Sequence, residues 1–181
     1  MSVIVVVRAS DGRSTWVGSD TLICGGNLKQ DYGPKWVVHA PWAIGVAGHL
    51  RTVNLIEQNI EGLTGSLKGA YDFALRAREI MKSDGYQGEP DERGPVALGG
   101  TLILANSAGA WVIGADFSIT TVSPGTAWAE GSGREIALGA IHALQSLETV
   151  FAPDDVLRRA IDAAMALDIN CGGHPWIHEV A

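Results

Sequence analysis

Ser2 is a candidate nucleophile because of its residue type and its position in the chain. It follows Met1 and is small, so methionine aminopeptidase would be expected to trim Met1 and leave Ser2 at the N-terminus. A serine hydroxyl attacks a carbonyl group only after a base has taken its proton. Most serine hydrolases use histidine, but none of the five histidines here has an evident triad setting. Ser2 therefore either uses another base or is simply the residue after the initiator.

A metal site is the other chemistry that the histidines suggest. His174 and His178 are four residues apart, the spacing of two ligands on one helical face. Pro175 lies between them and is incompatible with a regular helix, and the sequence places no third ligand nearby. We therefore expect no metal and no cofactor.

The composition excludes several classes of function. The chain has 181 residues, of which 46% are hydrophobic and 18% charged, with a net charge of −7. Because its Lys and Arg residues do not cluster, a nucleic-acid partner is not expected. The apolar runs are far shorter than the roughly 20 residues of a membrane-spanning helix, and the N-terminus lacks the features of a secretory signal. We expect one domain, residues 1–181, in the cytoplasm.

The two cysteines, Cys24 and Cys171, do not make a disulfide framework, which fits a reducing compartment. Cys24, beside Gly25 and Gly26, is expected to be a passive buried thiol. Residues 83–95 are rich in Gly, Pro and acidic side chains and are expected to form a long exposed loop.

Two hydrophobic periods alternate along the chain. Apolar, β-branched runs bounded by turn residues predict three hairpins, two short strands and a final strand: 3–7 with 15–18, 35–39 with 42–46, 101–105 with 111–114, then 120–122, 126–129 and 176–180. Apolar residues spaced by three or four predict helices over 53–63, 73–80 and 136–147, and a fourth from 153 onward. Hairpins favour antiparallel sheets, and two helix pairs separated by strands suit an α+β, four-layer αββα sandwich.

Six short motifs lie at the boundaries of these elements. They are SVIVVVR at 2–8, VGSD at 17–20, PKWV at 34–37, IGVAG at 44–48, EGSG at 130–133 and DINCGG at 168–173. Each is weak alone, but their order along the chain resembles that of proteasome β subunits and their bacterial peptidase relatives. The resemblance covers almost the whole chain and implies the N-terminal-nucleophile (Ntn) hydrolase fold.

The resemblance also implies the missing base, which is the free α-amino group of Ser2 itself. Its reference pKa is about 7.7–8.0, so part of it is neutral near neutral pH. By the same resemblance, the Lys35 ammonium would favour the neutral amine, Asp20 would hold Lys35, and the Gly48 amide would bind the oxyanion. Asp11 is a less favoured substitute for Asp20 if the first hairpin is in another register.

Three further residues are carried over by the resemblance. Ser132, Asp168 and Cys171 would surround and orient the α-amine, although Ser132 could also be only the N-cap of the following helix. This chain departs from the family at two of its positions. Ser2 replaces the usual threonine, and Cys171 stands where the family has serine, with a thiol as the weaker hydrogen-bonding group.

The function implied is a threonine-peptidase-like hydrolase that uses serine and cleaves peptides or unfolded protein inside a self-assembled ring. A separate ATPase unfoldase could feed such a ring, since this chain has no phosphate-binding loop. Two alternatives stay open. One is an inactive ring or scaffold protein, and the other is a small-molecule amidase of the Ntn group.

Overall fold

The fold was taken from a computed structural model, which describes residues 2–25, 28–61, 69–84, 99–147 and 151–180. A four-stranded antiparallel sheet contains the N-terminal strand. Its strands run in the order β10, β1, β2, β11, with bounds Ala127–Gly131, Val3–Arg8, Thr15–Ser19 and Trp176–Val180. All six residues of β1 are buried, because the strand is paired on both edges and covered on both faces.

The second sheet has five antiparallel strands in the order in which they follow along the chain. They are β5 (Trp36–His39), β6 (Trp42–Gly48), β7 (Gly100–Asn106), β8 (Gly109–Ile113) and β9 (Ile119–Val122). Consecutive strands pair as hairpins, except that α1, α3 and the segment around them intervene between β6 and β7.

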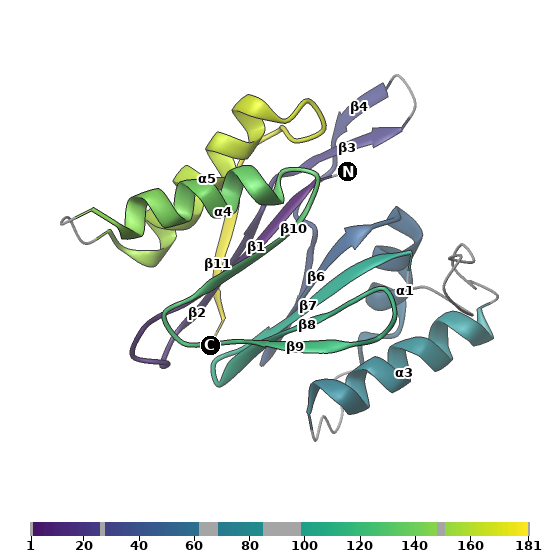
Figure 1. Ribbon diagram of the computed structural model, residues 1–181. Coiled ribbons are helices and arrows are strands. Elements are labelled where there is room, and N and C mark those ends of the chain that lie inside the picture. Colours follow the sequence, from purple (N-terminus) through teal and green to yellow (C-terminus); the bar gives the residue numbers. More distant parts are fainter. Residues whose placement is uncertain (1, 26–27, 62–68, 85–98, 148–150, 181) are drawn as a thin grey trace.

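Helices cover the outer faces of the two stacked sheets (Figure 1). Helices α4 (Arg134–Gln145) and α5 (Pro153–Leu167) pack on β1, β2 and β10, whereas α1 (Leu50–Gln58) and α3 (Ala70–Ser83) contact the five-stranded sheet. Three buried apolar clusters separate the four layers, one under each helix pair and one between the sheets. The expected αββα sandwich is confirmed.

Strand β1 shows how alternation serves two cores at once. Val3, Val5 and Val7 belong to the cluster under α4 and α5, while Ile4 and Val6 belong to the cluster between the sheets. Successive side chains of a strand point to opposite faces, so a run of β-branched residues suits a strand that is covered on both sides. The strand that begins beside Ser2 is therefore held from all directions.

The structure differs from the expected elements in several places. A two-stranded ribbon, β3 (Leu22–Gly25) and β4 (Leu28–Asp31), was not predicted. Helix α1 ends at Gln58, where a turn at Asn59 separates it from the helical residues 60 and 61. Helix α4 ends at Gln145, so Leu147 lies beyond it and is 55% exposed. Most of the expected 83–95 loop lies outside the described residues, as does position 63.

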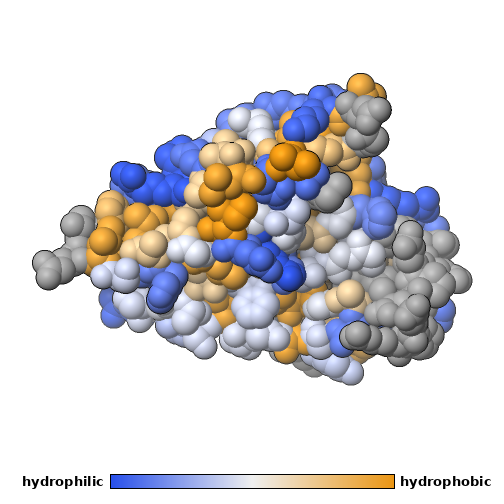
Figure 2. Space-filling model, turned by 45° about the horizontal axis from the view of Figure 1, so that its top comes forward, coloured by the Kyte–Doolittle hydropathy of each residue, from blue (hydrophilic) through white to orange (hydrophobic). Residues whose placement is uncertain are grey.

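Apolar side chains also reach the surface near the ribbon and beyond α5. Leu28 on β4, Leu167 and Ile169 are each more than 70% exposed. Hydrophobic surface lies in several patches on the face that Figure 2 presents. Among the helices that the structure describes, none combines the length and the apolar character needed to cross a membrane.

Candidate active site

Ser2 lies immediately before β1 and is only 6% exposed. Its carbonyl oxygen accepts a hydrogen bond from the Gly133 amide at 3.3 Å, and the Ser132 hydroxyl lies 3.5 Å from the same oxygen. Gly131 makes this approach possible. Its φ is 101°, a left-handed conformation that favours glycine, and a Cβ there would collide with the Ser2 carbonyl. The EGSG segment thus fixes Ser2 through its backbone.

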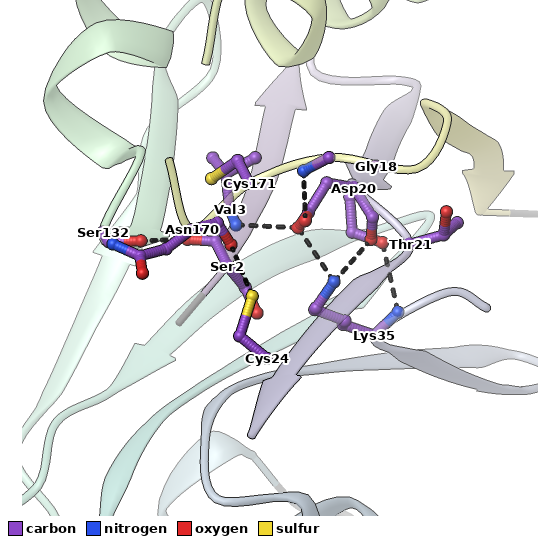
Figure 3. A network of polar contacts seen from close by, with 12 residues as sticks. Ser2, Val3, Gly18, Asp20, Thr21, Cys24, Lys35, Ser132, Asn170 and Cys171 are labelled. Carbon is purple, nitrogen blue, oxygen red and sulfur yellow. Dashed lines mark hydrogen bonds and ion pairs between the residues drawn. The ribbon is translucent and has the colours of Figure 1, made fainter. Parts of the chain in front are cut away.

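Lys35 and Asp20 form a buried ion pair close to Ser2 (Figure 3). The Lys35 ammonium donates to Asp20 Oδ1 at 2.9 Å and to the Asp20 carbonyl at 2.9 Å. Burial lowers the pKa of Lys35, and the attraction of Asp20 only partly offsets that effect. Asp20 directly follows β2 and Lys35 directly precedes β5, so the ion pair joins the two sheets.

Asp20 accepts more than the lysine. Its Oδ1 also receives the Val3 amide at 2.9 Å, and its Oδ2 receives the Gly172 amide at 3.1 Å. The preceding Ser19 hydroxyl accepts the Lys35 amide at 3.1 Å. Asp11 lies in the turn between β1 and β2, where its Oδ1 accepts the Arg13 amide at 2.9 Å. Asp20 is therefore the carboxylate that the fold places beside Lys35.

Asp168 ends α5 and gathers a second group of polar side chains. The Cys171 thiol donates to Asp168 Oδ2 at 3.4 Å, and Oδ1 receives the Asn170 amide at 2.9 Å. Burial opposes ionisation, but the hydrogen bonds from Ser132, Asn170 and Cys171 outweigh it, and the pKa of Asp168 lies below its ordinary value. Burial raises the pKa of Cys171 to about 12, helped by the nearby carboxylates. Cys171 is therefore a neutral donor here.

Ser132 does not cap α4. The N-cap position belongs to Gly133, with no side-chain cap, so the alternative structural role for Ser132 is wrong. Its side chain instead lies beside the Ser2 carbonyl, as Figure 3 shows.

Two hollows meet at Ser2. The walls of the first are largely apolar, and it is lined by Ser2, Ile23, Cys24, Tyr32, Lys35, Val46, Gly48, Leu50 and Val53. The second lies toward the EGSG segment and is lined by Ser2, Ala47, Gly48, Glu130, Gly131, Ser132 and Arg134. Gly48, the last residue of β6, borders both hollows.

Several residues of these walls were not singled out by sequence. Cys24 was expected to be a passive buried thiol, but it is partly exposed and lines the first hollow with Ser2. The ribbon that carries it lacks the apolar alternation that would have identified β4 as a strand. Glu130 lies inside the EGSG motif, yet only the three-dimensional arrangement places its side chain in the second hollow.

The two histidines that suggested a metal have other contacts. His174 lies 3.3 Å from the Thr21 hydroxyl and 3.2 Å from Asp31, and His178 stacks on Trp176. Within the described parts of the chain, no three His, Cys, Asp or Glu side chains gather as metal ligands.

Comparison with known proteins identifies the architecture. No protein-family model matches the chain, and no curated protein sequence matches it. Among solved structures, it is similar to Thiobacillus denitrificans BPH in complex with epoxomicin, with a TM-score of 0.82, 19% identity and coverage of 98% of this chain and 97% of the other. The chain has the BPH fold.

Two further structures agree with the BPH fold. A second structure of Thiobacillus denitrificans BPH gives a TM-score of 0.80 at 21% identity, over 98% and 96% of the two chains. Eukaryotic HslV from Trypanosoma brucei gives 0.75 at 18% identity, over 98% of each chain. The proteasome-type fold implied by the motifs is thereby confirmed. In this chain, Ser2 directly precedes the central strand β1 and lines both hollows.

Proposed function

We propose that this chain is a proteasome β-subunit-like N-terminal-nucleophile peptidase, with Ser2 as nucleophile once Met1 has been removed. The observation that carries the proposal is the position of Ser2 at the meeting of two hollows, close to the buried pair of Lys35 and Asp20. The similarity of the fold to BPH, whose complex with epoxomicin is known, supports the same conclusion.

The proposed reaction begins when the neutral α-amine of Ser2 takes the proton of the Ser2 hydroxyl. The hydroxyl oxygen attacks the substrate carbonyl carbon, and the oxyanion that forms is bound by the Gly48 amide. The α-ammonium then passes its proton to the departing amine as the C–N bond breaks, which leaves an ester on Ser2. Water adds to the ester, releases the carboxylic acid and restores the hydroxyl.

The surrounding residues have distinct roles in this scheme. The Lys35 ammonium disfavours a second positive charge nearby and so keeps the α-amine neutral, while Asp20 holds Lys35 in place. Ser132, Asp168 and Cys171 orient the amine through their hydrogen bonds. The Cys171 thiol serves as a donor to Asp168, since it is protonated at neutral pH.

The proposed substrate is a peptide or an unfolded protein segment, cleaved inside a ring of identical subunits in the cytoplasm. Leu28, Leu167 and Ile169 expose large apolar side chains that assembly would bury. The fold likeness to HslV supports the same arrangement. Any unfoldase that feeds the ring would be a separate ATPase.

The proposal is tested by mass spectrometry of the intact protein. We expect the mature chain to lack Met1 and to gain the mass of one epoxomicin molecule per subunit, on a peptide that contains Ser2. The Ser2→Ala variant, which we expect to keep the fold, should gain nothing. Retention of Met1 together with no labelling of the wild type would favour the inactive scaffold instead.

A further inference from the structure

The second hollow lies between the two sheets, at the end of the molecule where β1 begins. Glu130 on β10 pairs in register with Ile4, whose side chain faces the other sheet. Residues directly opposite one another in an antiparallel pair point to the same face, so the Glu130 carboxylate also faces the space between the sheets. Ala47 and Gly48 of β6 form the facing wall.

The Glu130 carboxylate is held in one orientation but is only half satisfied. Its Oε1 accepts the Trp128 indole at 2.9 Å, and its side chain is 14% exposed. Its Oε2 lies 3.8 Å from Arg134, which is beyond hydrogen-bonding distance. A carboxylate that is largely withdrawn from water, with one oxygen fixed and the other weakly paired, is suited to receiving a cation.

Arg134 does not close that position. Its side chain is 54% exposed, at the start of α4, and its guanidinium also lies 3.9 Å from Glu135. Exposed ion pairs at such distances contribute little, so the side chain can move toward Glu135 at small cost. Glu130 and Arg134 are the charged side chains that line the hollow, and Arg134 is shared with Glu135 outside it. Because the arginine is exposed and shared, it neutralises the Glu130 carboxylate only weakly, and that carboxylate can pair with a positively charged guest.

The chemistry proposed above assigns the two hollows to the two halves of a substrate. The departing amine takes its proton from the Ser2 α-ammonium, which the proposed mechanism places beside Ser132, so it leaves on the side of the EGSG segment. That side is the second hollow, which Gly131 and Ser132 line. The acyl half then occupies the more apolar first hollow, against Val46 and Leu50.

We propose that Glu130 is a specificity-determining residue of the leaving-group side and selects peptides with lysine or arginine directly after the cleaved bond. This inference rests on the proposed function, because it needs Ser2 to cleave an amide. Pairing of a substrate ammonium with a partly exposed carboxylate is expected to favour lysine by about three- to fivefold over alanine, and glutamate should be disfavoured by a similar factor.

The test uses the full chain without Met1 and three internally quenched peptides that share one acyl half. They carry lysine, alanine or glutamate as the first residue of the leaving half, and kcat/KM is measured for each. We expect the lysine-to-glutamate ratio to be about tenfold in the wild type and to fall to about one in Glu130→Gln. Arg134→Gln should raise the ratio, because it frees the Glu130 oxygen.

Glu135→Gln is the matched control. It removes the same charge beside the same arginine, but Glu135 is 86% exposed and does not line the hollow, so the ratio should fall far less than in Glu130→Gln. A ratio near one in the wild type, a preference for glutamate, or equal changes in Glu130→Gln and Glu135→Gln would overturn the assignment while the alanine peptide is cleaved. If no peptide is cleaved, both the assignment and the peptidase proposal fail.

Discussion

The Val3 amide donates to Asp20 Oδ1 at 2.9 Å, and Lys35 donates to the same oxygen at the same distance. One carboxylate oxygen thus connects the residue that follows the candidate nucleophile to the candidate source of positive charge. The backbone at Ser2 and the Lys35 ammonium are placed relative to each other through Asp20. A change at Asp20 should alter the protonation of the site as well as its geometry.

The first prediction concerns pH. Asp20 raises the pKa of Lys35 against the larger lowering effect of burial, so Asp20→Asn should lower that pKa further. The Ser2 amine would also lose a compensating negative charge, and its pKa should fall too. In a profile of labelling rate against pH, the acidic limb reports deprotonation of the Ser2 amine and the alkaline limb reports deprotonation of Lys35. Both limbs should therefore move to lower pH. The profile can be measured with epoxomicin, with thermal unfolding recorded at each pH. An unmoved alkaline limb would remove Lys35 from the proposed mechanism.

The second prediction concerns the thiol beside Asp168. In Cys171→Ser, a hydroxyl replaces the weaker thiol donor to Asp168, and we expect the labelling rate to be maintained or to rise a few-fold. In Cys171→Val, the donor is lost while the apolar volume stays similar, and the rate should fall by about tenfold for the loss of one hydrogen bond to a charged group. Equal rates in the two variants would mean that Cys171 contributes packing alone.

The third prediction separates the two cysteines. A thiol with a pKa of about 12 that is 5% exposed is almost entirely protonated and shielded at pH 8, so Cys171 should resist iodoacetamide until the protein unfolds. Cys24 is partly exposed in the first hollow and should be alkylated in the folded protein. Peptide mapping will distinguish them. Prior labelling of Ser2 should protect Cys24, and unprotected Cys24 would mean that the inhibitor does not occupy this hollow.

The fourth prediction concerns Gly131. In Gly131→Ala, the new Cβ would meet the Ser2 carbonyl at a backbone conformation that alanine disfavours, so we expect a loss of about 2 kcal/mol of stability and of most labelling. Gly139 is the matched control, because it lies within α4, is exposed and has open space around a built Cβ. Gly139→Ala should stabilise the protein by about 0.5–1 kcal/mol. Urea unfolding and the labelling assay measure both effects.

The fifth prediction tests a residue remote from Ser2. Arg8 is buried and donates to the carbonyls of Gly12, Ala108 and Val122, which joins the turn after β1 to both sheets. Its Nε has no hydrogen-bond partner in the described structure. Arg8→Ala should lower the melting temperature by several degrees, since it removes a buried side chain and its three hydrogen bonds, one of them to the carbonyl of the buried Val122. The labelling rate at 25 °C should be unchanged, and a large loss of rate would contradict the separation of stability from reactivity.

Much of the fold followed from local patterns. The β-branched run at 3–7 predicted β1, the turn residues Asp11 and Gly12 predicted the end of the first hairpin strand, and the apolar period after 153 predicted α5. Pro153 with Asp154 and Asp155 marked the start of α5 because proline and acids suit the first helical turn. The β3–β4 ribbon was missed because every described residue of β4 is exposed and no apolar alternation marks it.

The candidate site was accessible from the sequence only in part. Motif order singled out Asp20 and Lys35, and the structure brings their charged atoms together. Asp20 also accepts hydrogen bonds from the amides of Val3, 17 positions away, and Gly172, 152 positions away. These contacts depend on how distant segments pack, for which the sequence has no local signal. The walls of the two hollows depend on the stacking of the sheets for the same reason.

The placement of Ser2 at the end of a strand paired on both sides has a consequence for how such a protein can diversify. Neither edge of β1 is free to slide, so this strand tolerates little change in length or register. The walls of the hollows come from other segments: the β3–β4 ribbon, the end of β6 and the end of β10. Substitutions in these segments can alter which molecules bind in the hollows without moving the Ser2 hydroxyl. Related chains could therefore differ in binding preference while the candidate nucleophile keeps its position.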